Sequence, residues 1–427
     1  MKLIHKVLVS TLCLTLLGHS ASSLHAEETK AAEASKQVLK WTVNLDKING
    51  IQKYGYSDPQ LAKDGTSYFM SRPVNGSAFS SLISISASGK VNWVYRVALK
   101  DISYNVVSPG NLFRATPDGN VFMEYHTEND ITVQRIGTDG KPKAEYRMTG
   151  AIKNFNAFRI TYLNGGILYA ARAEKDGTIR LVQYNAQGKV IWQKPVGKGF
   201  QQAPKGTFSV THDMEIIDNH VVVHQASYVE VYNLKGDKLW RISKKTNERY
   251  SPRFLSDGSA VAEVRTIEKG ASVATRLVGI HNTGKTRWTL QADAGSNLYR
   301  FGNSFVYTNT NADGRDRQLT AIDPATGKTT ASFSSQVLAV MNKSYYEGRD
   351  YMADPYLFLG EYNSNYKNTG YRLLDPVTLK PVPLPVDLNV FSKRDTITAQ
   401  LKPLYLQQGS QPYVLYWNSY ELRRYDL

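Results

Sequence analysis

The chain has a single cysteine, Cys13, among its 427 residues. One thiol can form neither an internal disulfide nor a zinc site built from cysteines. No apolar run approaches the roughly 20 residues that a membrane-spanning helix needs, so we expect no transmembrane segment. With 41% hydrophobic and 21% charged residues, the composition excludes collagen-like, low-complexity and disordered proteins. The sequence predicts a folded protein that depends on its hydrophobic core.

The first 26 residues have the organisation of a secretory signal peptide. Lys2 and Lys6 precede an apolar stretch over residues 7–17, and small and polar residues lead to a cleavage point after Ala26. The cysteine lies inside this stretch and lacks the small preceding residues of a lipoprotein signal, which argues against a lipid anchor. We therefore predict export, with residues 27–36 as a mobile leader rich in Ala, Glu and Lys.

Positive charge exceeds negative charge. Lysine and arginine number 52 against 37 aspartates and glutamates, for a formal net charge of +15. An excess of this size favours anionic partners, and its densest stretch is residues 235–249. Because an exported bacterial protein meets anionic wall polymers and acidic glycans before nucleic acid, we predict a secreted or cell-wall-associated protein without a nucleic-acid partner.

A short motif recurs along the chain and indicates a repeat fold. A run of β-type residues ends in a turn that closes on glycine, and tryptophan often follows four residues later. Four copies with tryptophan close on Gly89, Gly188, Gly236 and Gly284, and weaker copies close on Gly140, Gly327 and Leu379. The copies are about 43 to 52 residues apart, close to the period of four-stranded propeller blades. Their Asn, Asp, Ser and Gly residues suit hairpin turns.

A second series of strands precedes these turns and has eight members. They are centred on Phe69, Phe122, Leu168, Val222, Val261, Val306, Leu357 and Val414. Eight such strands with seven turns leave the last unit short of one strand. Residues 38–45 resemble the tryptophan strands, so we predict that they pair with residues 420–427. This pairing closes a single eight-bladed β-propeller domain over residues 37–427, with seven blades as the alternative.

Five of the six tryptophans occupy equivalent places in the outer strands. They are Trp41, Trp93, Trp192, Trp240 and Trp288. A ring at such a place is expected to pack between neighbouring blades, where its burial stabilises the fold by a few kcal/mol. We interpret these tryptophans as structural.

The copy at residues 321–327 has Ala321, Asp323, Thr326 and Gly327, with Ala331 at the tryptophan position. It resembles the PQQ-like, or quinoprotein-type, propeller repeat, and the resemblance covers essentially the whole chain after residue 26. The resemblance implies an all-β propeller and an exported binding or assembly scaffold. Quinone-dependent members of the family carry adjacent cysteines and a calcium site beside the quinone. The sequence has no such cysteine pair or acid cluster, so we expect no cofactor.

Histidines and acids form no recognisable catalytic or metal motif. His220 and His224 share one face of a predicted strand but lie about 13 Å apart, too far to bind one metal ion. His212 is more typical of a loop histidine than of an acid–base pair with Asp213. Residues 309–316 resemble a calcium loop, but amides replace carboxylates and no glutamate completes it. A plain hairpin is favoured there.

Tyrosines and asparagines gather between residues 345 and 371. Our candidate ligand-binding residues are Tyr345, Tyr346, Tyr362, Asn363, Asn365, Tyr366 and Asn368. Loop tyrosines offer flat apolar faces, and asparagines offer hydrogen-bonding groups, which together suit sugars or peptides. Glu347 and Asp350 could serve as paired carboxylates for glycan cleavage, although their spacing is not diagnostic.

The sequence favours an exported, noncatalytic propeller, expected to be a monomer. It would bind a cell-wall polymer, glycan or protein at the bacterial surface. The alternative is a propeller-type enzyme, a lyase or hydrolase, that acts on polysaccharides through groups brought together from different blades. A pocket in which ionisable groups converge would favour the enzyme, whereas an aromatic face would favour binding.

Overall fold

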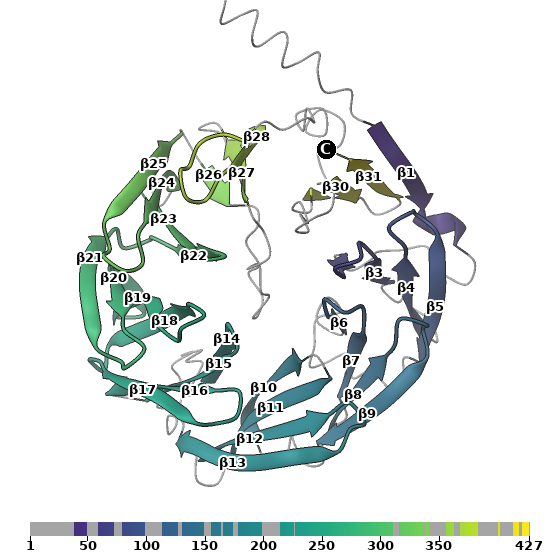
Figure 1. Ribbon diagram of the computed structural model, residues 1–427, viewed down its shortest axis with the longest axis horizontal. Coiled ribbons are helices and arrows are strands. Elements are labelled where there is room, and N and C mark those ends of the chain that lie inside the picture. The colour runs from purple at the N-terminus through teal and green to yellow at the C-terminus, as the bar shows by residue number, and fades with distance from the viewer. Residues whose placement is uncertain are drawn as a thin grey trace, which may run out of the picture.

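The computed structural model describes residues 38–48, 59–71, 79–98, 113–126, 130–148, 155–163, 165–173, 178–198, 214–225, 227–310, 316–335, 338–340, 356–362, 368–382, 400–401, 413–417 and 421–426. Within these ranges the protein consists of strands β1 to β31 and one 3₁₀ helix, η1 (Leu45–Lys47). The strands form eight antiparallel sheets, seven of four strands and one of three. Figure 1 shows the sheets arranged around a common axis, as in a β-propeller.

Seven of the sheets are formed by consecutive strands. The first three comprise β2 (Gln60–Leu61), β3 (Ser67–Met70), β4 (Phe79–Ile85) and β5 (Val91–Ala98); β6 (Phe113–Ala115), β7 (Val121–His126), β8 (Ile131–Ile136) and β9 (Pro142–Met148); and β10 (Phe155–Leu163), β11 (Gly166–Ala173), β12 (Thr178–Asn185) and β13 (Val190–Lys198). The next two comprise β14 (Met214–Ile217), β15 (His220–His224), β16 (Tyr228–Asn233) and β17 (Lys238–Ser243); and β18 (Glu248–Phe254), β19 (Ala260–Glu268), β20 (Ala271–Ile280) and β21 (Thr286–Ala292). The last two comprise β22 (Leu298–Phe301), β23 (Ser304–Thr310), β24 (Asp316–Ile322) and β25 (Thr329–Ser334); and β26 (Leu338–Val340), β27 (Leu357–Tyr362) and β28 (Asn368–Leu374).

Second strands are deeply buried, as β3 and β15 show. The eight strands predicted to precede the turns are β3, β7, β11, β15, β19, β23, β27 and β30. In β15, Val222 packs toward the β18–β21 sheet, whereas Val221 and Val223 pack toward the β10–β13 sheet. Side chains alternate between the two faces of a strand, so a strand covered on both faces needs a continuous apolar run.

The terminal sheet joins the two ends of the chain. It contains β29 (Gln400–Leu401), β30 (Tyr413–Trp417), β31 (Glu421–Asp426) and β1 (Val38–Asn44), in the order β1-β31-β30-β29. The pairing predicted between residues 38–45 and 420–427 is present, because β1 pairs antiparallel with β31 along its length. Val43 and Leu45 pack with Leu422 and with side chains of β3 and β4. The terminal sheet is therefore anchored to the β2–β5 sheet.

The turns between third and fourth strands have the predicted hairpin geometry. The Gly89 N–H donates to the Ser86 carbonyl at 2.9 Å, and Gly89 has a φ of +81°, a region that favours glycine. The other glycines that close these turns also have positive φ: Gly140, Gly188, Gly236, Gly284 and Gly327. A register shift accompanies each of these turns, as in a hairpin with a β-bulge.

Outer-strand tryptophans contact the turn of the next sheet. Trp41 Nε1 donates to the Ala87 carbonyl at 2.8 Å, and a Cβ built on Gly89 would lie 2.7 Å from the indole. Trp93 and Trp288 make the same two kinds of contact with the turns that follow them. Glycine thus serves both the backbone conformation and the close approach of the ring.

The remaining two tryptophans of the series pack differently. Trp240 Nε1 donates to the Gly258 carbonyl at 3.2 Å, in the turn between β18 and β19. Trp192 packs against the apolar cluster between the β10–β13 and β14–β17 sheets, with the Lys194 ammonium 5.3 Å from its ring centroid. Neighbouring sheets are therefore joined by related contacts rather than by one repeated bond.

A leucine fills the space where the series lacks a tryptophan. Ala331 occupies the tryptophan position of β25, and Leu379 replaces the glycine of the next turn. Leu379 is buried and belongs to the same apolar cluster as Ala331. Its φ of +52° costs a leucine about 1 to 2 kcal/mol, whereas its burial contributes about 1.5 to 3 kcal/mol. Leu379, which replaces the turn glycine, therefore compensates for the missing tryptophan at residue 331.

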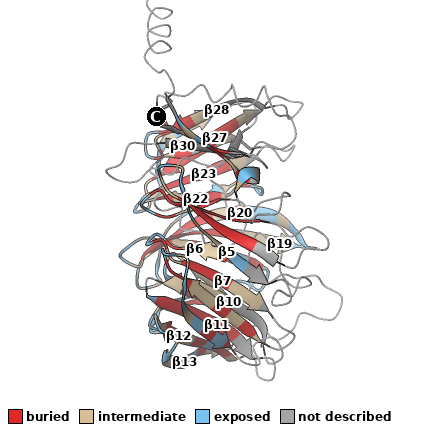
Figure 2. Ribbon diagram, turned by 90° about the vertical axis from the view of Figure 1, so that its right-hand side faces the viewer, coloured by how far each residue is buried: buried red, intermediate tan, exposed pale blue. Residues whose placement is uncertain are grey.

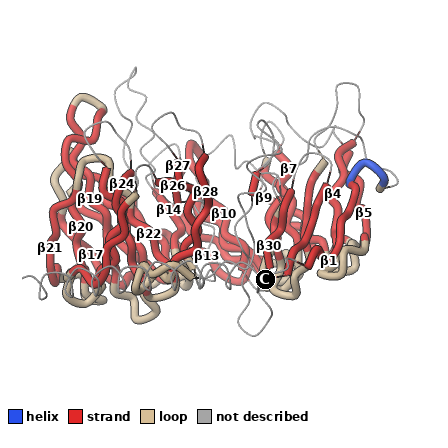
Figure 3. Tube along the Cα trace, turned by 90° about the horizontal axis from the view of Figure 1, so that it is seen from above, coloured by secondary structure: helices blue, strands red, loops and turns tan. Residues whose placement is uncertain are grey.

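The turns between first and second strands and those between third and fourth strands lie along one edge of the ring, whereas the turn between β19 and β20 lies at the opposite edge (Figure 3). Inner turns join the first and second strands near the axis, and outer turns join the third and fourth strands at the circumference (Figure 1). We call the edge with the inner and outer turns the turn face. Buried residues occupy the body of the sheets, and exposed residues lie toward the turns (Figure 2). Within the described ranges, no helix has the length and apolar character that a membrane crossing requires.

Candidate functional site

Two of the seven candidate binding residues lie in described strands. Tyr362 ends β27, Asn368 begins β28, and the two residues are paired in register. The prediction that both belong to the connecting loop is wrong, because a register shift after Glu361 lets the hairpin continue to this pair. The other five lie outside the described residues: Tyr345, Tyr346, Asn363, Asn365 and Tyr366.

The candidate tyrosines belong to segments attached to opposite ends of β27. Residues 341–355 precede the strand, and residues 363–367 follow it. From Leu357 to Tyr362 an extended strand covers about 17 Å. The seven candidate residues therefore stay a prediction, of which only the strand positions of Tyr362 and Asn368 are described.

The two histidines of β15 engage different partners. The His220 ring stacks on Phe254 with centroids 4.0 Å apart, and its Nδ1 lies 2.7 Å from the Asp218 carbonyl oxygen. At the other end of the strand, His224 Nε2 lies 3.7 Å from Glu215 Oε1. Among the described residues, no group of three or more His, Cys, Asp or Glu side chains could hold a metal ion. His212 is outside this part of the chain.

Acid should destabilise the protein partly through His220. Burial holds the pKa of His220 below its ordinary value of 6.5, against the opposing effect of Asp218. The unfolded chain therefore takes up a proton more readily than the folded protein, so the free energy of unfolding should decrease as the pH falls below about 6.5. In urea titrations at pH 7.5 and 5.5, His220→Phe is expected to lose less stability on acidification than the wild type. His281→Phe, at a turn residue, is the control, and equal losses in all three proteins would contradict the prediction.

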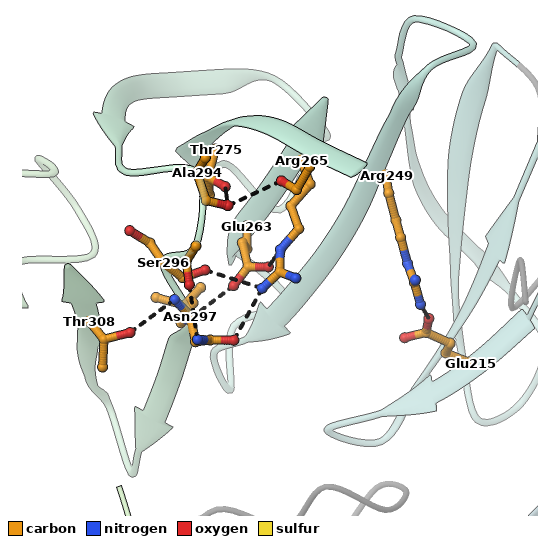
Figure 4. A network of polar contacts seen from close by, with 12 residues as sticks. Glu215, Arg249, Glu263, Arg265, Thr275, Ala294, Ser296, Asn297 and Thr308 are labelled. Carbon is orange, nitrogen blue, oxygen red and sulfur yellow. Dashed lines mark hydrogen bonds and ion pairs between the residues drawn. The ribbon is translucent and has the colours of Figure 1, made fainter. Parts of the chain in front are cut away.

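Polar contacts hold the connection between β21 and β22 (Figure 4). Glu263 Oε2 accepts a hydrogen bond from the Leu298 N–H at 2.9 Å, and its Oε1 pairs with Arg265 at 2.5 Å. Arg265 in turn donates to the Ser296 carbonyl and to Asn297 Oδ1, each at 3.1 Å. Both carboxylate oxygens of Glu263 are thus used to fix β22 beside β19.

Glu248, in β18 of the same sheet, makes similar contacts with the connection that precedes this sheet. Its Oε1 accepts from Arg276 at 2.9 Å, and its Oε2 accepts from the Lys245 N–H at 3.0 Å. Burial tends to raise the pKa of Glu248, but these hydrogen bonds outweigh it and hold the pKa below its usual value. The carboxylate therefore stays ionised and fixes the connection between β17 and β18.

Glu215 lies between His224 and Arg249. Its Oε1 is 3.7 Å from His224 Nε2 and 3.9 Å from Arg249 Nη2 (Figure 4). These distances are longer than direct hydrogen bonds. The Arg249 side chain is 46% exposed, against 18% for Glu215. Glu215 consequently offsets part of the positive charge of Arg249, which remains exposed to solvent.

Asp218 joins three consecutive sheets. It lies in the turn between β14 and β15, and its Oδ2 accepts from the Phe254 N–H of β18 at 2.7 Å. The same oxygen pairs with Arg300 Nη1 of β22 at 3.2 Å, with both side chains about nine-tenths buried. Asp218 and Asn219 have φ of +48° and +61°, as in a type I′ turn. This turn directs a carboxylate into the contact between sheets.

Basic side chains dominate the exposed part of the described surface. Exposed lysines and arginines outnumber exposed aspartates and glutamates. The dense stretch at residues 235–249 does not form one patch: Lys235 lies in an outer turn, whereas Lys245 and Arg249 lie at the opposite end of the sheets. The structure therefore combines acids used between sheets with bases available at the surface. The arrangement is suited to attracting anions.

Comparisons with known proteins gave one matching family model and several similar solved structures. The family model for PQQ-like repeats, described as outer membrane protein assembly factor BamB, matches residues 147–302. No curated protein sequence matches the chain. Similar solved structures include the C-terminal WD40 domain of Sif2, with 9% identity, a TM-score of 0.48 and coverage of 92% of this chain and 98% of that chain. The Dos1 propeller has 8% identity, a TM-score of 0.48 and coverage of 91% and 95%.

The dihydro-heme d1 dehydrogenase NirN is also similar, with 14% identity, a TM-score of 0.43 and coverage of 81% of this chain and 71% of that chain. The matched residues 147–302 run from the end of β9 to the start of the β22–β25 sheet and include three glycine-closed turns. Over these residues the chain matches the family model of the PQQ-like β-propeller repeats.

Proposed function

We propose that the protein is an exported, noncatalytic propeller that binds an anionic polymer at the bacterial cell surface. The observation that carries this proposal is the contrast between its acids and its bases. Asp218, Glu248 and Glu263 are engaged in contacts between sheets or their connections. Exposed lysines and arginines, by contrast, face solvent in excess over exposed acids. Acids used in this way support the fold, whereas exposed bases raise the local concentration of anionic partners.

We also propose that residues 37–427 form one closed ring of eight blades. Apolar clusters connect neighbouring sheets in order, from the terminal sheet to the β26–β28 sheet. The terminal sheet takes one strand from the start of the chain, which supports closure by the two ends. In such a ring the two faces and the circumference are the surfaces left for a partner.

The family match supports a scaffold in preference to an enzyme. The matching family model is described as an assembly factor, which is a binding role. Tyr362 and Asn368 pair at the end of one hairpin, and tyrosine and asparagine are residue types that suit a sugar ligand. A neutral or acidic glycan contact there would add specificity to the electrostatic attraction.

Binding to purified bacterial cell walls tests the proposed function. The protein without residues 1–26 is expected to sediment with the walls at about 50 mM salt and to be released by about 1 M salt, because the Debye length falls to about 3 Å. Binding that is unchanged at 1 M salt would contradict an electrostatic origin. Release of soluble sugar products would instead favour the polysaccharide-acting enzyme.

Export is tested on the cells that make the protein. The protein recovered from the medium and from the wall fraction is expected to begin at Glu27, as read by N-terminal sequencing. Recovery in the cytoplasm with residues 1–26 intact would contradict export.

A further inference from the structure

A lysine occupies one repeated position on the turn face. It is the first residue after the glycine, or after Leu379, of an outer turn. We call the residues at this position the rim lysines: Lys90, Lys141, Lys189, Lys285, Lys328 and Lys380. They come from six different sheets, and all six side chains are exposed. The repeat therefore places one lysine at the outside of each of six sheets.

The backbone of each rim lysine is fixed, whereas its side chain is not. The carbonyl oxygen of every rim lysine accepts a hydrogen bond from the first residue of its turn, at 2.8 to 3.0 Å. Lys90 also donates its N–H to Ser86 Oγ at 3.0 Å. Within the described residues, no rim lysine side chain makes a hydrogen bond or an ion pair. The turns thus hold the cations at regular places and leave their ammonium groups available.

The series is interrupted at two sheets, the β14–β17 sheet and the terminal sheet, whose third and fourth strands are not joined by a turn. Asp237 occupies the position after Gly236, and its Oδ1 pairs with Lys194 of the preceding sheet at 2.9 Å. The rim lysines consequently form two arcs. Lys90, Lys141 and Lys189 form the first, and Lys285, Lys328 and Lys380 form the second.

The inner turns of the same face carry the opposite charge. Asp64, Asp118 and Asp257 are exposed there and outnumber the exposed Lys63. Hydrogen bonds from Ser259 lower the pKa of Asp257, so this acid remains ionised. A flat anionic surface laid across the turn face would meet these acids, whereas a thin chain that follows the circumference would avoid them. The charge pattern favours a linear polyanion over a membrane.

We propose that the rim lysines form the contact surface for a linear polyanion, which lies along the outer turns and meets one lysine at each of six sheets. This assignment rests on the proposed function and names the surface that performs it. Lysine is a compact point charge without the planar fork of arginine, so phosphate and carboxylate polymers satisfy the same site. Because several weak contacts act together, long chains should bind far more tightly than short ones.

The test compares two sets of six substitutions that remove the same charge. The rim variant changes every rim lysine to glutamine. The control variant carries Lys47→Gln, Arg96→Gln, Arg147→Gln, Arg180→Gln, Lys245→Gln and Lys269→Gln, all toward the opposite end of the sheets. Fluorescent alginate and long-chain polyphosphate are titrated at low salt, with tripolyphosphate as the short comparison. The rim variant should lose at least about tenfold in affinity for both long polymers, and the control variant less than about threefold.

Several outcomes would overturn the assignment. If the wild type binds cell walls but the rim variant binds the long polymers as tightly as the control variant, another surface makes the contact and the proposed function survives. If the wild type binds neither walls nor polymers at low salt, the proposed function fails as well. Tighter binding to phosphatidylglycerol vesicles than to either polymer, lost in the rim variant, would identify a membrane as the partner. Each arc changed alone should give an intermediate loss, which keeps the test valid if the sixfold variant folds poorly.

Discussion

Deletion of residues 27–46 from the protein without residues 1–26 is expected to abolish cooperative folding or to cause aggregation. The deletion removes β1 and leaves β31 as an unpaired edge strand. It also removes the buried Val43 and Leu45, and burial of such side chains contributes about 1.5 to 3 kcal/mol each. Loss of the Trp41 contact with the next turn adds to this. Together these losses approach the roughly 5 to 15 kcal/mol that stabilises a domain.

Thermal unfolding followed by circular dichroism, together with size-exclusion chromatography, measures this effect. Deletion of residues 27–35, which removes none of the described residues, is the matched control and should leave the midpoint unchanged. A longer deletion with the full thermal stability of the wild type would show that the two ends of the chain do not share a sheet in solution. The count of eight blades would then have to be abandoned.

Asp218→Asn is expected to reduce the free energy of unfolding by about 3 to 5 kcal/mol, the usual cost of breaking a buried ion pair. The substitution leaves the Arg300 guanidinium buried without its counter-charge. Asparagine tolerates the positive φ of this turn and can still accept the hydrogen bond from Phe254. The substitution therefore measures the effect of the Asp218 charge on stability while the backbone conformation of the turn is kept.

Urea denaturation of four proteins separates the contributions at Asp218. Asn219→Asp changes an exposed neighbour in the same turn and should alter stability by less than about 0.5 kcal/mol. The double variant Asp218→Asn with Arg300→Met should recover part of the loss, because an unpaired buried cation costs more than an absent pair. A loss below about 1 kcal/mol in Asp218→Asn alone would mean that water or another group compensates Arg300.

The features that could be predicted from the sequence are those whose determinants are local. A turn glycine such as Gly89 is required by the φ of its own residue, and a second strand such as β15 is recognisable from its uninterrupted valines. Both signals lie within a few residues, so spacing alone located the strands and the turns. The partner of β1 was accessible for a related reason, because only one of the eight predicted units lacked the turn that leads to an outer strand.

Contacts between sheets could not be predicted in this way. Asp218 and Arg300 meet across two sheet boundaries, and no local pattern marks them as partners. The sequence shows Ala331 in place of tryptophan and Leu379 in place of glycine. Only the structure shows that the Leu379 side chain fills the space of the missing tryptophan ring. The rim lysines were present in the same aligned copies that revealed the turns. Their meaning depended on knowing that all the outer turns share one face.

The terminal sheet also has a consequence for the order in which the chain folds. β1 is made first, whereas its partner β31 is made last, so this pair of strands spans almost the entire length of the folded chain. Every other sheet takes its strands from consecutive residues and can form as soon as its own segment emerges. Contacts between residues so distant in sequence are slow to form. The terminal sheet must therefore wait for the synthesis of β31, whereas every other sheet can form before the chain is finished.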